Sequence, residues 1–255
     1  PALGDIQFQE QIAKSYYNGL QTSLRRRSKN GLTLLVSYTF SKAMDTASST
    51  NNSSTGTQKF PQDIHNLQLE RALADFHRQH RFTASFNNEL RFGKGRAYMS
   101  DAGGAANFFL GGWQLNGIVT ILSGRPFTPQ FASPDIAQQR PDIIGDPLSN
   151  IPAGRAFNPA AFAEPVATAG DPNLFGNAGR NILIGPWFNS TDLSLIKNFR
   201  ITEGAKVQFR WEVFNVFNNT NFQVPVFQLD ASNVGTYTQT ANENREMQFA
   251  LKLIF

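Results

Sequence analysis

Apolar and polar residues alternate along seven segments of the chain. In the last segment Met247, Phe249, Leu251, Leu253 and Phe255 fall on one side of an extended backbone, because successive strand side chains point to opposite faces. Each segment is about ten residues long, which matches a tilted strand that crosses a bilayer. The predicted strands are residues 16–27, 32–42, 80–92, 112–124, 188–199, 205–217 and 244–255.

The connections between these segments alternate in length. SKNG and RITEG are tight turns, whereas residues 44–78, 125–187 and 218–243 are long loops. Residues 93–112 form a link of intermediate length. Outer-membrane barrels carry short turns on the periplasmic side and long loops outside. The alternation therefore predicts an all-β antiparallel meander, part of a transmembrane β-barrel, with the three long loops at one end.

The number of predicted strands is odd. A single-chain bacterial barrel has an even number of strands and both termini in the periplasm, and an open sheet edge is not tolerated in lipid. We therefore expect residues 1–255 to be one segment of a longer barrel. Without the neighbouring strands, the sheet is expected to be open and curved, or closed in a small non-native way.

The composition supports strands that are apolar on one face only. Charged residues make up 16% of the chain, against about 25% in soluble proteins, yet the mean hydropathy is −0.32. No apolar run approaches the roughly 18 residues of a spanning helix. The chain contains 23 phenylalanines, which suit strands and lipid-facing surfaces. It contains no cysteine, which excludes a disulfide framework and thiolate metal ligands.

The net charge of +4 raises the question of nucleic-acid binding. The basic residues do not form one patch, and the densest run, Arg25 to Lys29, lies at a tight turn. Nucleic acid is therefore not an expected partner. The first residues, PALGDIQFQEQ, lack the pattern of a signal peptide, so we expect such a peptide to be removed or to lie upstream.

Six ordered blocks resemble the barrel of TonB-dependent outer-membrane receptors, in the subgroup with a carboxypeptidase-regulatory-like N-terminal domain. The blocks, between about residue 16 and the C-terminus, are YYNGLQTSLRRRSKNGLTLLVSYTFSKAMD, HRFTASFNNELRFGKGR, LGGWQLNGIVTILSGRPFTP, AFNPAAFAEP, FGNAGRNILIGPWFNSTDLSLIKNFRI and VQFRWEVFNVFNNTNFQVP.

The resemblance implies a role in transport. Such receptors resemble 22-stranded barrels filled by a plug, and they import scarce or bulky solutes such as siderophores or oligosaccharides. This chain would supply the last seven strands in the bacterial outer membrane. The implied partners are the membrane lipid, the rest of the barrel and its plug, the TonB complex through an N-terminal region, and the outer-membrane assembly machinery.

The polar faces of the predicted strands carry charged residues. Two roles are open for them: a path for solute, or salt bridges among themselves and with a plug, and the second is favoured because sheltered charges need partners. The candidate lumen-facing residues are Glu89, Arg91, Lys206, Arg210, Glu212, Glu246 and Lys252.

The tryptophans and histidines divide between structural and binding roles. Trp113 and Trp211 suit the aromatic girdles at the membrane interfaces, whereas Trp187, at the mouth of the longest loop, is the candidate for solute contact. His77 and His80 could share a metal ion, but hydrogen bonding at the base of a strand is the favoured interpretation.

No motif indicates catalysis. No serine lies in a nucleophile-elbow motif, and GKGR lacks the spacing of a phosphate loop. We therefore expect no enzyme activity, no cofactor and no metal site. The alternative to transport is a cell-surface or soluble β-sheet module that uses its long loops for adhesion. Membrane fractionation separates the two, because only a barrel wall needs lipid or detergent.

The last strand is the predicted assembly signal, formed by Phe249, Leu251, Leu253 and Phe255. In the full-length protein, deletion of Phe255 or Phe255→Asp is expected to lower the amount assembled in the outer membrane while synthesis continues. The measurement is heat-modifiable electrophoretic mobility of the outer-membrane fraction. An unchanged folded band would show that Phe255 is not part of the signal.

Overall fold

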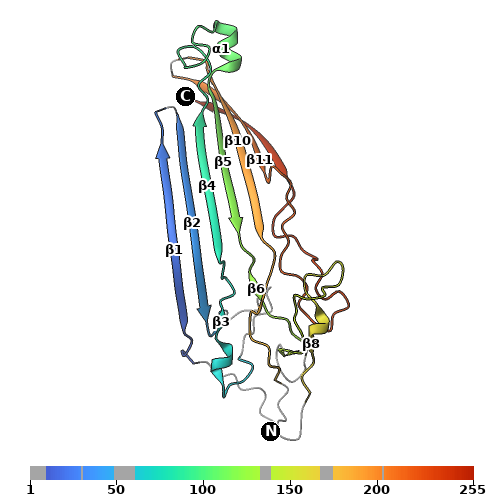
Figure 1. The fold of residues 1–255 in the computed structure, drawn as a ribbon. Coiled ribbons are helices and arrows are strands. Elements are labelled where there is room, and N and C mark those ends of the chain that lie inside the picture. Colours follow the sequence, from blue (N-terminus) through green and yellow to red (C-terminus); the bar gives the residue numbers. More distant parts are fainter. Residues whose placement is uncertain (1–9, 30, 49–60, 133–138, 167–174, 203) are drawn as a thin grey trace, which may run out of the picture.

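Seven long strands form one antiparallel sheet in the computed structural model (Figure 1). They are β1 (Ser15–Arg27), β2 (Leu32–Asp45), β4 (His80–Glu89), β5 (Trp113–Leu122), β10 (Phe188–Arg200), β11 (Lys206–Phe214) and β12 (Glu246–Ile254). The structure describes residues 10–29, 31–48, 61–132, 139–166, 175–202 and 204–255. Each long strand overlaps one predicted strand, and the predicted all-β antiparallel meander is confirmed.

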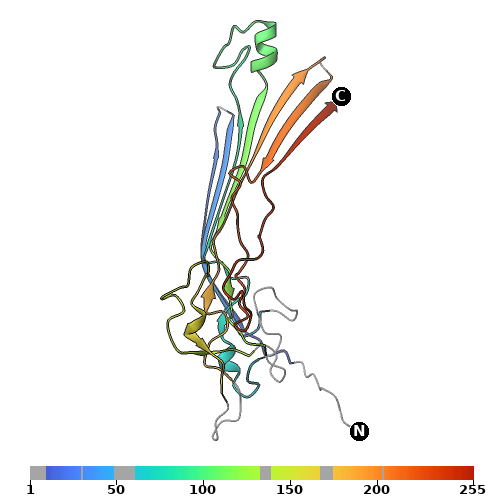
Figure 2. The same cartoon turned by 90° about the vertical axis from the view of Figure 1, so that its right-hand side faces the viewer.

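The sheet is open. Its strands follow the order β1-β2-β4-β5-β10-β11-β12, so that β1 and β12 are its edges, and the short strand β3 (Ala72–Leu73) pairs with the end of β2. Figure 2 shows that β10, β11 and β12 turn away from the plane of β1 and β2. The predicted open, curved sheet is therefore the observed one.

The three long connections lie at one end of the sheet, as predicted, and the C-terminus lies at the other (Figure 1). The long connections contain short elements: η1 (Leu67–Glu70), η2 (Pro159–Ala161), β6 (Pro126–Phe127) paired with β9 (Leu183–Ile184), and β7 (Asp142–Ile143) paired with β8 (Phe162–Ala163). Within the described part of the chain, no helix is both long and apolar enough to span a bilayer.

Some strand boundaries differ from the predicted ones. The strand predicted to reach residue 92 ends at Glu89, and the strand predicted to reach residue 217 ends at Phe214. Asn215 has a φ of 50°, which an extended strand cannot accommodate. The link between β4 and β5, for which no secondary structure was predicted, contains the helix α1 (Gly104–Leu110).

The strand register separates two faces. Phe86 lies opposite Gly117, Gly117 opposite Leu193, and Trp211 opposite Phe249, so these side chains share one face, which we call the apolar face. The other face, here the polar face, carries Thr83, Ser194, Glu212 and Gln248 among others.

Phe86 stabilises the middle of the apolar face. Its ring and the Leu193 side chain occupy the space where a Cβ at Gly117 would lie. An aromatic ring over a strand glycine covers backbone that would otherwise be exposed and helps to hold the register. The two neighbouring strands β4 and β5 are thus joined by packing as well as by their hydrogen-bond ladder.

We expect the polar face to tolerate an added charge and the apolar face not to tolerate it. An arginine at a lipid-facing position near the bilayer midplane costs about 2–4 kcal/mol. In the full-length protein, Phe86→Arg is therefore expected to lower assembly strongly, as measured by heat-modifiable mobility in membranes. Trp211→Arg is expected to lower it less, because the cost of arginine falls towards the interface where Trp211 is assigned to an aromatic girdle. The matched variants Thr83→Arg and Gln208→Arg, on the polar face, are expected to assemble nearly normally. Equal loss in both pairs would contradict the assignment of the faces.

Candidate functional site

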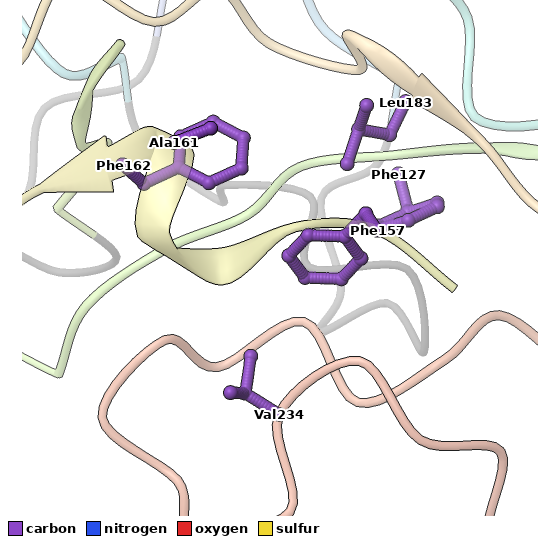
Figure 3. Packing of buried hydrophobic residues seen from close by; sticks show 6 residues of the cluster. All are labelled: Phe127, Phe157, Ala161, Phe162, Leu183 and Val234. Carbon is purple, nitrogen blue, oxygen red and sulfur yellow. The ribbon is translucent and has the colours of Figure 1, made fainter. Parts of the chain in front are cut away.

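The long connections pack against one another through a small hydrophobic core (Figure 3). The rings of Phe127 and Phe157 lie 5.9 Å apart and those of Phe157 and Phe162 lie 6.0 Å apart, and Val234 joins them from the connection between β11 and β12. We call residues 61–79, 123–132, 139–166, 175–187 and 215–245 the loop platform. Residues of the last four segments share this core, so they form a packed structure at the loop end of the sheet.

Beside this core lies a buried network of charged side chains: Asp45, Glu70, Asp75, Arg140 and Arg180, none more than 7% exposed. Arg140 Nη2 lies 3.1 Å from Glu70 Oε1, and Arg180 Nη1 lies 3.6 Å from Asp75 Oδ1. Arg180 also forms an ion pair with Asp45, which is the last residue of β2. The network therefore attaches the loop between β5 and β10 to the end of β2 and to the loop that follows it.

Additional hydrogen bonds reach the same buried side chains, although Asp75 Oδ2 has no hydrogen-bond partner among the described residues. Gln62 Oε1 accepts from Arg140 Nε at 2.9 Å, and Asn181 Nδ2 donates to Asp75 Oδ1 at 2.8 Å. Burial lowers the pKa of Arg140, and the charge of Glu70 opposes that shift. Removing one partner of such a network leaves an uncompensated buried charge, which costs about 3–5 kcal/mol.

A polar pocket of about 200 Å³ lies where the polar face meets the loop platform. Its strand residues all belong to the polar face of β1, β2 and β4, and the remaining residues precede β4. The lining residues are Tyr17, Gln21, Thr39, Ser41, Ala43, Phe76, His77, Arg78 and Arg81. This pocket is the candidate functional site, because it is a concave polar site on the face that would line a barrel lumen.

The pocket is positively charged. Burial, together with the neighbouring cations Arg125 and Arg81, lowers the pKa of Arg78 to about 10, so Arg78 stays charged at neutral pH. Among the described residues, none of the ion pairs includes these three arginines. Arg78 donates to the carbonyl of Ser123, and Arg125 Nε donates to the carbonyl of Asp75 at 3.2 Å. A group of cations without a carboxylate partner suits an anionic ligand.

The two histidines considered as metal ligands have separate partners. His77 Nδ1 accepts the backbone N–H of Ala43 at 3.2 Å, and burial lowers the pKa of His77, which favours the neutral ring that this bond requires. His80 Nδ1 lies 2.8 Å from the Tyr38 hydroxyl. Within the described ranges, no group of three or more histidine, aspartate or glutamate side chains could hold a metal ion.

Trp187 lies away from the pocket. Its ring stacks on His80 at 5.7 Å, and His80 in turn lies 5.2 Å from the ring of Phe40, its cross-strand neighbour on the apolar face. The Trp187 side chain is 55% exposed. This geometry favours a place in an aromatic girdle at the loop end of the sheet over the predicted contact with solute.

Four of the predicted lumen-facing residues lie in two separate places. Arg210 pairs with Glu212 at 2.6 Å, and Gln248 donates to Glu212 from the neighbouring strand, which fits the predicted salt bridging on the polar face. Glu89, at the end of β4, lies 3.9 Å from Arg96, and Arg91 follows the end of that strand. The structure therefore does not join the predicted lumen charges into one continuous path.

At the edge of the sheet, Lys206, Glu246 and Lys252 lie on the polar face of β11 and β12. The four residues of the predicted assembly signal lie at the C-terminal edge, and all are exposed: Phe249, Leu251, Leu253 and Phe255. Recognition of these residues by the assembly machinery stays a prediction.

The buried charge network was not predicted from the sequence. Arg140 and Arg180 lie in a proline-rich loop whose residues show no period, and their partners Glu70 and Asp75 lie in another loop. The sequence did contain one indication that this loop is packed. The segment AFNPAAF contains two phenylalanines, Phe157 and Phe162, and both are buried in the platform core.

The chain was compared with protein families, curated proteins and solved structures. A protein family described as an outer membrane beta barrel domain matches residues 1–248. No curated protein and no solved structure matches the chain.

Substitution of Arg180 tests whether the buried charge network stabilises the loop platform. In the full-length protein, Arg180→Met is expected to loosen the platform by about 3–5 kcal/mol, because Asp45, Glu70 and Asp75 lose their shared cation. The measurement is the rate at which proteinase K cleaves the long loops of the assembled protein. Arg96→Met is the matched control, since Arg96 forms an exposed pair worth about 0–1 kcal/mol. Equal cleavage rates in the two variants would show that the network does not hold the platform.

Proposed function

The chain belongs to the outer membrane beta barrel domain family, and we propose that it forms part of the barrel wall of a TonB-dependent transporter. Family membership places the chain in the bacterial outer membrane, with its strands in the bilayer. The apolar face is then the lipid-facing surface and the polar face lines the lumen. Transport, and its dependence on TonB, are the proposed steps beyond the family.

The edges of the sheet support a larger barrel. β1 and β12 each have a neighbour on one side only among the described strands, and unpaired backbone groups cannot remain exposed to lipid. We propose that an odd number of further strands from the same protein closes the sheet and that a plug fills the enclosed lumen. The ordered sequence blocks that resemble TonB-dependent receptors support this arrangement.

The pocket under the loop platform is the observation that carries the transport proposal. It lies on the lumen side at the loop end, which is the extracellular end of an outer-membrane barrel. Arg78 and Arg81 line it. A solute that enters through the platform would therefore meet cations first, and we propose an anionic solute, such as a ferric siderophore or an acidic oligosaccharide.

The alternative, a soluble or cell-surface adhesion module, fits the structure less well. Such a sheet would bury its apolar face against a second layer, whereas Leu251 is 74% and Phe249 67% exposed here. The larger hollow, about 360 Å³, lies on this same apolar face and is lined by Leu115, Leu193 and Trp211 among others. It suits a lipid chain rather than a polar ligand.

The proposal is tested with the full-length protein and the TonB protein of the same bacterium. The purified receptor is expected to bind the periplasmic domain of TonB in a saturable 1:1 complex, as measured by isothermal titration calorimetry. In cells, uptake of one of two anionic probes, ⁵⁵Fe-ferric citrate or a labelled acidic oligosaccharide, is expected to require both this gene and the tonB gene. No binding to TonB, together with uptake unaffected by deletion of tonB, would contradict the proposal.

The pocket is tested separately with charge-neutral variants. Arg81→Gln is expected to raise the half-saturating concentration of the transported probe about tenfold, because one lost charge-assisted contact corresponds to about 1.4 kcal/mol. Arg27→Gln is the control. Arg27 lies on the polar face, like the pocket residues of β1, but it is the last residue of that strand and lies at the end away from the pocket. An equal effect of the two substitutions would remove the pocket from the transport path.

A further inference from the structure

The link between β4 and β5 folds back over the apolar face at the turn end of the sheet. The ring of Phe108, in α1, lies 5.0 Å from the ring of Phe199, and Trp113 Nε1 donates to the carbonyl of Phe109 at 2.8 Å. Trp113 and Phe199 belong to the apolar face of β5 and β10. The helix α1 therefore packs on the lipid side of the barrel wall and not under the lumen.

A buried lysine connects this helix to the sheet. Lys197 lies on the apolar face between Trp113 and Phe209 and is 2% exposed. Its ammonium lies 5.2 Å from the ring centre of Trp113, and it donates to the carbonyls of Phe109 and Gly111. The last carbonyls of a helix have no partner within it, and the C-terminal end of a helix favours a cation. Lys197 thus fixes the C-terminal end of α1 to the wall.

The exposed surface of the helix is apolar. Phe108 is 54%, Phe109 68% and Leu110 41% exposed, and the Phe108 ring continues the apolar face of β10 through its contact with Phe199. The surrounding link, residues 90–112, contains three basic residues, Arg91, Lys94 and Arg96, against one acid, Asp101, and only Arg96 forms an ion pair, an exposed one with Glu89 of β4, among the described residues. Apolar side chains beside basic ones are typical of segments that lie in a membrane interface with anionic headgroups.

We propose that α1 is an interfacial anchor that lies in the periplasmic leaflet of the outer membrane. Its occupant is phospholipid: Phe109 and Leu110 contact the acyl chains, and the basic residues contact the headgroup phosphates. The position follows from the topology, because α1 lies at the end opposite the long loops, which is the periplasmic end of an outer-membrane barrel (Figure 1). The inference rests on family membership and is independent of whether the protein transports a solute.

The anchor is tested by measuring depth with a fluorescent label. The full-length protein, with Phe109→Cys as its single cysteine, is labelled with an environment-sensitive dye and placed in nanodiscs of phosphatidylethanolamine and phosphatidylglycerol. Spin-labelled lipids then quench the dye, with the spin label at acyl carbon 5 or carbon 12. Leu251→Cys, on the apolar face of β12, is the lipid control, and Ser232→Cys, exposed in the loop platform, is the water control.

The label at position 109 is expected to be quenched at least twofold more strongly by carbon 5 lipid than the label at position 232. In the same background, Lys197→Met is expected to reduce this quenching and Lys197→Arg to retain it. Quenching at position 109 equal to that at position 232 would show that α1 faces the periplasm and overturn the proposal. This readout from the Phe109→Cys protein holds even if Lys197→Met fails to assemble.

Discussion

The structure depends on one constraint: a backbone that crosses lipid must satisfy its own hydrogen bonds. Between β1 and β12 the seven strands meet this constraint through continuous antiparallel ladders, and only the outer sides of these two edge strands lack a neighbour among the described strands. Their register also decides the chemistry of each face, because a slip of one residue would exchange the two faces completely. The packing of Phe86 over Gly117 holds the register where a glycine would otherwise weaken it. The separation of the two faces and the end at which the long loops lie both follow from this ladder.

At the loop end, water replaces lipid and a different kind of packing becomes possible. The platform combines a core of phenylalanines with a buried network around Arg180, which holds the ends of loops far apart in the sequence. Buried ion pairs add little net stability by themselves. An arrangement of the loops that left one of these charges buried without its partner would be strongly destabilised, so the network favours the one arrangement in which the charges are paired. A platform held in one arrangement keeps the cationic pocket at a defined position on the lumen side.

At the turn end, Lys197 violates the alternation of its own strand. A lysine on a lipid-facing surface is unfavourable, and such departures from a local rule often mark a function or a compensating contact. Here the contact is with the carbonyls of α1, and the rings of Trp113 and Phe199 cover the ammonium. The same link is longer than a typical periplasmic turn because it contains the helix and the loop that returns to it.

The sequence by itself determined the seven strands, their two faces and the end at which the long loops lie, because alternation is a local property that a lipid-facing wall requires of every strand. At the edge of the sheet, Phe249 and Leu251 lie opposite Trp211 and Phe209, on the face that the alternation predicts. Only the tertiary structure decided which loop residues meet. Arg180 forms an ion pair with Asp45, which lies 135 residues away in the sequence, and the ring of Trp187 stacks on His80 of the apolar face. Loop residues have no period, so their partners depend on how distant segments pack, and a linear pattern does not contain that information.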